Sequence, residues 1–385
     1  MVKDALTSRQ RILLAIDHEE ADRVPVIFRQ LIAFNQHWGH PFERAEWLVA
    51  HGADEALEFH LDWTYHPDVQ VWHRRESRPG ECWEILTAGF GTPAGTLHIA
   101  VRKSDDYPFD EAQLAGDHNI SDRFVQRLIA GPADLEKFRY LLHVPRGDEL
   151  AGFRASARAV RDFSAGRFLV EGHAGLAPSE IVMALLGLEE IAFGVMDRDP
   201  FVLELLEMLD EWYTRRLEIL LEEKPDVVVL RPLYETVDFW SPDLVRRVFL
   251  PPLRRWTEMI HQAGAKARCY TVTGVMPILD VYEDAGIDVL AGCDPAPHGD
   301  ADLAVMKERI GRRVCLMGGL NPTVTVERGS ERQVRDAVIH AIDRCAVGGG
   351  FILSTAGSIW ETTQQAYDNV MTVIRTCNEH GRYGT

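Results

Sequence analysis

The sequence contains few cysteines, and their spacing forms no metal or redox motif. Six cysteines occur in 385 residues, and none belongs to a Cys-x-x-Cys pair. Small secreted domains that depend on disulfides use cysteine much more densely. We therefore expect reduced thiols in a cytoplasmic protein, and a fold stabilised by a large apolar core.

Long apolar runs are also absent. No uninterrupted apolar stretch approaches the roughly 18 residues that indicate a membrane-spanning helix. Residues 1–5 lead directly into a polar segment and lack the apolar region of a signal peptide. We expect neither a membrane span nor a signal peptide.

Positive charge is scarce relative to negative charge. Lysine and arginine total 41 against 59 aspartates and glutamates, which gives a formal charge of −18. Nucleic acids and anionic membranes bind through a net attraction to phosphate, so a surface this acidic argues against both as partners. A local basic pocket for a small acidic ligand remains compatible with this balance.

Common nucleotide-binding and hydrolytic motifs are missing. The sequence has no P-loop, no Rossmann glycine fingerprint and no Gly-x-Ser-x-Gly elbow. It also lacks a Gly/Ser-rich or low-complexity linker that would separate independent domains. We expect a single domain over residues 1–385.

What the sequence does contain is an alternation of short β-rich runs with helical patterns. Each run is apolar and bounded by Gly, Pro or Asp, as buried parallel strands are. Eight such units favour an α/β fold of the closed (β/α)8 TIM barrel type, with an open doubly wound sheet as the alternative. The predicted strands are residues 24–28, 56–60, 168–171, 227–230, 266–270, 288–291, 313–317 and 350–353.

One region, from about residue 65 to 125, breaks this alternation. Three β-rich runs occur there, at 69–72, 82–86 and 96–101, and a Gly-Thr-Pro-Ala-Gly turn separates the last two. Antiparallel strands joined by a tight turn produce this pattern. We predict a small antiparallel β insertion after the second barrel strand.

Short motifs follow one another in a characteristic order along nearly the whole chain. They are SRQRILLAI at 8–16, DRVPV at 22–26, TPAGTL at 92–97, Ser241-Pro242, MGGLN at 317–321, GGGFIL at 348–353, Asp368-Asn369 and GRY at 381–383. In this order they resemble the uroporphyrinogen decarboxylase superfamily, and the turn at 92–97 is similar to one common in its corrinoid-linked methyltransferase branch. The resemblance implies a TIM barrel and is much less specific for the reaction.

The resemblance also implies a zinc site whose ligands this chain lacks. The family's zinc methyltransferases carry His-x-Cys at the end of a late strand and a further Cys after the last strand, and the metal stabilises the thiolate of the acceptor. Here the first two positions fall on Tyr270 and Val272, or after a one-residue slip on Thr271 and Thr273, and the third falls on Gly357. We do not expect zinc at these positions.

The pattern of the decarboxylase branch is incomplete as well. Its Arg-Gln-Ala-Gly-Arg segment appears here as RQLIA at 29–33, so only the first arginine is kept. Its late histidine falls near residues 356–357 and is missing. True uroporphyrinogen decarboxylation is therefore not expected.

Substrate-binding candidates follow from the position of active sites in TIM barrels, at or just past the C-terminal ends of the strands. An arginine there can grip a carboxylate or phosphate bidentately, although a structural ion pair is the alternative. The residues predicted to bind substrate on this ground are Arg29, His60, Arg231, Tyr270 and Asn321.

Three further residues at strand ends are candidates for catalysis. His173 lies between small residues in EGHAG at 171–175, and its imidazole could act as an acid, as a metal ligand or in a structural role. Tyr234 and Glu235 follow the fourth strand, where related proteins carry acidic residues, and a Glu235–Arg231 ion pair is the alternative. We predict that Arg29, His173, Arg231, Tyr234 and Glu235 converge on one pocket. Two arginines beside one glutamate also predict surplus positive charge and an anionic or strongly polar ligand.

Metal binding is left open by the sequence. Cys293, Asp294, His298 and Asp300 have metal-capable side chains, but their spacing fits no standard zinc pattern. A cysteine with apolar neighbours is more often a small core residue.

The resemblance implies an enzyme that moves a methyl group between a small methylated substrate and a corrinoid (cobalamin) carried by a partner protein. An O-demethylase is the specific hypothesis, in which His173, Tyr234 or Glu235 protonates the leaving oxygen. One alternative is a decarboxylase whose acidic substrate is held by Arg29 and Arg231. Another is a binding protein that kept the barrel without the chemistry.

Overall fold

A computed structural model describes residues 6–105, 107–114 and 123–384 of the chain. The chain divides into two compact units. The first comprises Met1–His60, Gly152–His173 and Leu220–Thr385, and the second comprises Leu61–Ala151 and Ala174–Ile219.

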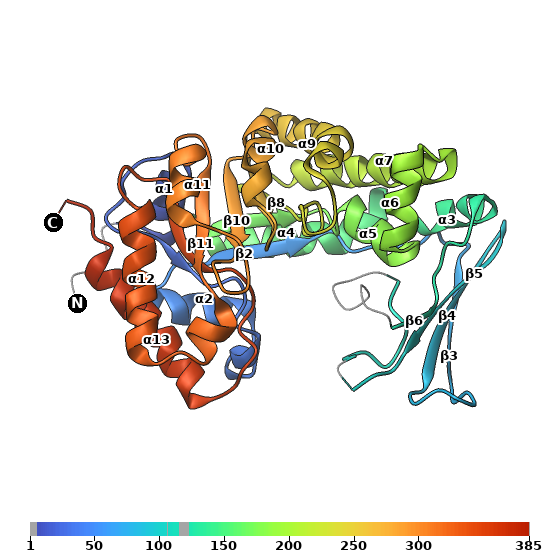
Figure 1. The fold of residues 1–385 in the computed structure, drawn as a ribbon, viewed down its shortest axis with the longest axis horizontal. Helices are drawn as coiled ribbons and strands as arrows, with labels where there is room; N and C mark the ends of the chain where they lie inside the picture. The colour runs from blue at the N-terminus through green and yellow to red at the C-terminus, as the bar shows by residue number, and fades with distance from the viewer. Residues whose placement is uncertain (1–5, 106, 115–122, 385) are drawn as a thin grey trace. The chain divides into compact units, whose positions relative to one another are not determined.

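An eight-stranded parallel sheet forms the centre of the first unit (Figure 1). Its strand order is β1-β12-β11-β10-β9-β8-β7-β2, and every neighbouring pair is parallel. This is the order of strands in a TIM barrel, and it confirms the predicted fold class. The strands are β1 (Val26–Ile27), β2 (Ala56–His60), β7 (Leu169–His173), β8 (Val227–Leu230), β9 (Lys266–Tyr270), β10 (Val289–Cys293), β11 (Cys315–Leu320) and β12 (Phe351–Thr355).

All eight predicted strands are present, and the differences lie at their ends. β2, β8 and β9 have the predicted bounds, whereas β1 is shorter and β7, β10, β11 and β12 continue past the predicted ends. The added residues include His173, Ser354 and Thr355. An apolar run ends before such residues. Polar residues can continue a strand, because the ladder is formed by backbone hydrogen bonds.

The two ends of the sheet, β1 and β2, meet without a ladder between them in the described part of the chain. At the base of this seam the Asp54 amide donates to the Val26 carbonyl at 2.8 Å. The Val26 amide in turn donates to the Asp54 carboxylate at 3.1 Å. The barrel is therefore joined at its base, and residues from both edge strands line the space above.

Alternation along the strands decides which side chains enter the barrel. Ala56 and Leu169 belong to the buried core inside the sheet, to which α1 (Ser8–Ile16) contributes Ile12 and Ile16. Because successive side chains point to opposite faces, Glu58 and His60 share the face of Ala56. Glu171 and His173 likewise share the face of Leu169.

Helices of the first unit follow the strands. In two places the cause of their bounds is visible: Ser330 and Gln333 form a capping box at the start of α12, and Pro251-Pro252, which lack amide donors, follow a π-helical turn at Val245–Phe249. The helices wholly within this unit are α1, α2 (Pro41–Ala50), α8 (Pro242–Leu244), α9 (Leu250–Gln262), α10 (Leu279–Asp284), α11 (Leu303–Arg309), α12 (Glu331–Cys345) and α13 (Gln364–His380). α4 (Ala151–Ser164) and α7 (Pro200–Glu222) cross the boundary between the units.

The second unit contains a four-stranded antiparallel sheet of order β3-β4-β5-β6, whose strands lie side by side in Figure 1. It follows β2 in the chain, which confirms the predicted insertion; residues 106 and 115–122 of the predicted region lie outside the described residues. The strands are β3 (Gln70–Glu76), β4 (Ile85–Thr92), β5 (Gly95–Arg102) and β6 (Phe124–Gln126), and the helices are α3 (Leu135–Phe138), α5 (Pro178–Leu185) and α6 (Leu188–Asp197).

Candidate functional site

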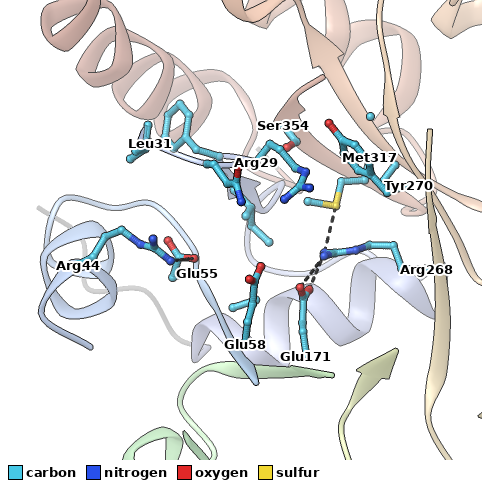
Figure 2. Close-up of a pocket in the computed structure, with 16 residues that line it drawn as sticks. Arg29, Leu31, Arg44, Glu55, Glu58, Glu171, Arg268, Tyr270, Met317 and Ser354 are labelled. Carbon is cyan, nitrogen blue, oxygen red and sulfur yellow. Dashed lines mark hydrogen bonds and ion pairs between the residues drawn. The ribbon is translucent and has the colours of Figure 1, made fainter. Parts of the chain in front are cut away.

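A pocket opens in the first unit above the seam between β1 and β2 (Figure 2). Its lining comes from the segment after β1, from β2 and from the inward faces of β7, β9, β10, β11 and β12. Arg29, Tyr270 and Ser354 lie at or near the C-terminal ends of strands, where TIM barrels build active sites. Glu55 and Ala56, by contrast, lie at the start of β2. The charged residues of the lining are Arg29, Arg44, Arg268, Glu55, Glu58 and Glu171.

Arg268 and Glu171 form a buried ion pair across the barrel. The two guanidinium nitrogens of Arg268 each meet one carboxylate oxygen of Glu171 at 2.5 Å, as the dashed lines in Figure 2 show. Arg268 is 8 % exposed and Glu171 is 1 % exposed. Since removal of one partner from such a pair costs about 3–5 kcal/mol, the pair forms a rigid wall of the pocket.

Glu55 is the second buried carboxyl group of the lining. It is 6 % exposed, and its nearest counter-charge is Arg44 at 3.5 Å. Burial raises the pKa of Glu55 to about 7, against the opposing charge of Arg44. The two side chains lie next to each other in Figure 2.

Arg29 is held against the ring of Tyr270. Its guanidinium carbon lies 4.2 Å from the ring centroid, a cation–π contact. The Arg29 amide donates to Thr355 Oγ1 at 3.2 Å, and the Tyr270 hydroxyl donates to the Ala356 carbonyl. Arg29 is thus fixed at the pocket, where its guanidinium also donates a hydrogen bond to the Tyr270 side chain.

The numbers of arginines and glutamates in this pocket are equal, whereas the sequence predicts a surplus of positive charge. The expectation of surplus positive charge rests on two arginines and one glutamate, whereas three arginines and three glutamates line the pocket. Arg268 is engaged by Glu171 and Arg44 lies beside Glu55. The difference arises because Glu55, Glu58 and Arg268 lie inside predicted strands or just before them, not past their ends.

Beside the pocket, Glu58, His60 and His173 form a cluster of three metal-capable groups. Their ligand atoms all lie within 4.8 Å of one another. Glu58 Oε2 is 3.4 Å from His60 Nε2 and 3.8 Å from His173 Nε2. The two imidazole rings stack with centroids 4.4 Å apart. The register of the sheet explains this contact, because His60 pairs with His173 at the ends of β2 and β7.

The cluster combines an ionised carboxylate with a buried neutral imidazole. Burial lowers the pKa of His173 to about 3, despite the opposing charge of Glu58. Burial alone would raise the pKa of Glu58, but a hydrogen bond from His60 and neighbouring positive charge, including that of Arg29, hold it well below its usual range.

His173 has an unsatisfied nitrogen. The side chain is 7 % exposed, and its Nε2 has no hydrogen-bond partner in the described structure. A buried polar atom left in this state costs about 1–3 kcal/mol. An atom of a ligand at this point would remove that cost.

The two remaining predicted catalytic residues, Tyr234 and Glu235, lie in the loop between β8 and α8. Tyr234 packs edge-on against Phe239, with centroids 5.4 Å apart. Glu235 is 5 % exposed. Burial raises the pKa of the Cys269 thiol, and the negative charge of Glu235 raises it further. Cys269 lies between Arg268 and Tyr270 on β9, so it points away from the pocket. Tyr234 and Glu235 are not among the residues that line the pocket.

Of the five residues predicted to converge, the structure brings two to this pocket, and the convergence of all five stays a prediction. Arg29 lines the pocket, and His173 lies beside it through Glu58. Arg231 is not in the lining, but its charge lowers the pKa of Tyr270 against the larger effect of burial, so it acts within reach of the pocket.

Asn321, predicted to bind substrate, has a structural set of partners. Its Nδ2 donates to both carboxylate oxygens of Asp294, at 2.8 and 2.9 Å, and lies 3.2 Å from His298 Nδ1. Its Oδ1 accepts from the Val324 amide at 2.8 Å. Nearby, burial raises the pKa of the Cys293 thiol to about 12, which keeps it protonated and makes it a poor metal ligand.

Sequence reasoning missed Arg44, Glu55, Glu58 and Arg268. The available signal was a charged residue within an otherwise apolar strand, as at Glu58 and Arg268, because a charge buried in this way requires a partner. The partner's identity depends on strand register, which the sequence does not reveal.

The positions that hold zinc in the family's methyltransferases carry other side chains in this chain. Tyr270 directs its hydroxyl to the Ala356 carbonyl, and Val272 packs against the barrel core. Neither these positions nor Thr271, Thr273 and Gly357 offer a thiolate or an imidazole. The residues present do not fit the family's zinc.

The fold is that of a TIM barrel. The chain belongs to the uroporphyrinogen decarboxylase family: the family's model, described as "Uroporphyrinogen decarboxylase (URO-D)", matches residues 123–380. Among solved structures, a methyltransferase from Methanosarcina mazei is similar, with a TM-score of 0.62 and 17 % sequence identity over 97 % of this chain and 99 % of that one. At this identity the likeness establishes the fold.

A second solved structure, D-psicose 3-epimerase in the presence of D-fructose, matches at a TM-score of only 0.33 and 8 % identity, over 59 % of this chain and 81 % of that chain. No curated protein matches the sequence. In the described residues, no helix combines the length and apolar character needed to cross a membrane.

Proposed function

We propose that the protein is a methyltransferase that moves a methyl group between a small methylated substrate and a corrinoid carried by a partner protein. The observation that carries this proposal is the charge balance of the barrel pocket, where three arginines meet three glutamates. Family membership and the similarity of the whole fold to a methyltransferase support it.

Charge balance weighs against the decarboxylase alternative. A substrate with many carboxylates needs several arginines free of counter-charges. In this pocket Arg268 is bound by Glu171, Arg44 lies 3.5 Å from Glu55, and the charge of Arg29 also acts on Glu58. We infer that Arg29, which lies against Tyr270, grips one anionic or polar group. A small substrate with a single such group fits this arrangement.

In the O-demethylase form of the proposal, Arg29 binds and orients the substrate while the ring of Tyr270 holds Arg29 in place. A reduced corrinoid, when bound, would supply the nucleophile for the methyl group. The substrate's C–O bond breaks, its electron pair stays on the oxygen, and that oxygen takes up a proton. Of the predicted donors, His173 lies nearest the pocket, but burial lowers its pKa to about 3, so near neutral pH it can offer an N–H hydrogen bond to the leaving oxygen and not the proton itself. Tyr234 and Glu235 remain the predicted donors of the proton.

An anaerobic assay tests this function. The purified chain is incubated with reduced cobalamin and a series of methoxylated aromatic and aliphatic acids, and the corrinoid absorbance and the demethylated product are followed together. Formation of both products at equal rates supports the proposal. Release of carbon dioxide instead would establish a decarboxylase, and binding without turnover would favour the binding-protein alternative.

Glu235→Gln tests whether Glu235 supplies the proton. The substitution keeps the shape and removes the acid, so loss of a proton-transferring group should reduce kcat roughly 10²–10⁴-fold. Its matched comparison is His173→Gln, measured on the same confirmed substrate. Unchanged turnover of Glu235→Gln together with loss in His173→Gln would remove Glu235 from the mechanism.

A further inference from the structure

We propose that Glu58, His60 and His173 form a site for a divalent transition-metal ion of the zinc class. These residues differ from the family's zinc positions, which carry no suitable ligands in this chain. The inference deepens the proposed function and, as to the metal's role, rests on it.

Two strands place the three ligands together. Glu58 and His60 are two residues apart on β2 and therefore share one face. His173 ends β7 and stands opposite His60 in the parallel register. Because a strand pair fixes all three backbone positions, the ligands belong to the rigid barrel.

The distances approach those of a coordination shell. With metal–ligand bonds of about 2.1 Å, ligand atoms of a tetrahedral site lie about 3.4 Å apart. Glu58 Oε2 is 3.4 Å from His60 Nε2 and 3.8 Å from His173 Nε2. The side chain of His60 is 53 % exposed, so it can move to complete the shell without disturbing the core.

A second observation points to a ligand at this place. His173 Nε2 is buried and has no hydrogen-bond partner in the described structure, and it faces Glu58. An ion pair with Glu58 does not satisfy it, because 3.8 Å exceeds hydrogen-bond distance. A metal ion between the two groups would be bound by both.

The donor set selects the metal. Two imidazole nitrogens and one carboxylate oxygen suit zinc and similar transition metals, whereas magnesium and calcium prefer oxygen ligands alone. Three protein ligands leave one position open, as in catalytic zinc sites. A metal there would stabilise the negative charge on the leaving oxygen of a methylated substrate, in place of a proton.

Metal binding is tested on the full chain after removal of metal with a chelator. Zinc is titrated calorimetrically, and cobalt(II) is added as a probe whose visible absorption reports coordination. We expect one equivalent of either metal per chain. His60→Ala and Glu58→Gln should weaken binding by about 100-fold or more, since even outer-shell partners of a metal contribute 10–100-fold.

His298→Gln and Cys293→Ser are the matched controls, because they remove metal-capable groups outside the cluster. They should bind metal as the wild type does. Loss of binding in these controls alone, equal affinity in all variants, or a preference for magnesium over zinc would overturn the site. Because His60 is exposed, His60→Ala should retain the circular dichroism spectrum and remain informative if His173 variants fail to fold.

Different results would refute the metal site and the proposed function. Binding of zinc that is lost in His60→Ala, without methyl transfer to any corrinoid, would keep the site and refute the proposed function. Methyl transfer at the wild-type rate by the metal-free chain or by His60→Ala would refute the metal's role.

Discussion

Glu55 illustrates how a single residue couples the pocket to the stability of the barrel. Its carboxyl group is 6 % exposed, and burial raises its pKa from 4.5 to about 7. As the pH rises from about 4.5 towards 7, the unfolded chain loses this proton before the folded chain does. Stability must therefore fall over this range, by ~3 kcal/mol at about 1.36 kcal/mol per pH unit.

Glu55→Gln should remove this pH dependence, because the amide does not titrate. Relative to the wild type, the variant should gain up to ~3 kcal/mol between pH 5 and pH 8. Thermal unfolding of both proteins at the two pH values measures the effect. Glu218→Gln, at a half-exposed site, is the control. If the unfolding temperatures of wild type and variant change by the same amount between the two pH values, Glu55 does not titrate with a raised pKa.

At the scale of elements, α7 fixes the segments that follow β2 and β7. Arg216 on this helix is fully buried and donates to the carbonyls of Leu61, Asp62 and Ala174, at 3.0 Å for Asp62 and 2.8 Å for Ala174. Burial lowers its pKa to about 10, which still leaves it charged at neutral pH. Leu61 and Ala174 directly follow His60 and His173 in the chain, so we expect a change at Arg216 to affect the two histidines.

Arg216→Met should lower stability by about 3 kcal/mol or more, because each buried carbonyl left without a donor costs about 1–3 kcal/mol. The substitution should also weaken cobalt(II) binding, measured at a low temperature at which the variant remains folded. Arg215→Met is the matched control, since Arg215 is the preceding residue and is 68 % exposed. Loss of stability with unchanged metal affinity would leave Arg216 a structural role alone.

For the barrel unit as a whole, the weak point is the seam between β1 and β2, which a buried charge network closes at the base. Asp54 is fully buried and binds Arg11 at 2.5 Å and Arg23 at 2.7 Å. The same carboxylate accepts from the Val26 amide of β1. The network joins α1, β1 and the segment before β2, which no β ladder connects in the described residues.

Asp54→Asn keeps the size of the side chain and removes the charge that two buried guanidinium groups share. We expect a loss of about 3–5 kcal/mol, the cost of breaking a buried ion pair. Thermal and urea unfolding measure it. Asp336→Asn removes the partner of Arg332 at a site where the two side chains are 66 % and 90 % exposed, and it should change little. Equal unfolding temperatures for both variants would disprove the role of Asp54.

Much of the fold and part of the site could be predicted from the sequence. Short apolar runs between helices located all eight strands, because burial on both faces of a parallel sheet imposes a local pattern. Arg29 and Tyr270 were found because they lie at or just past strand ends, and both line the pocket. His60 and His173 were found on the same ground, and they stack beside it.

Only the tertiary structure decided which of these residues act together. The contact of Glu58 with His173 depends on the register of β2 against β7, and that of Arg268 with Glu171 depends on the curvature of the sheet. The charge of Glu235 acts on the buried thiol of Cys269, an interaction that no local pattern records. Such contacts join residues tens of positions apart or more, and their free energy is set by how strands pair and close, not by the neighbours of each residue along the chain.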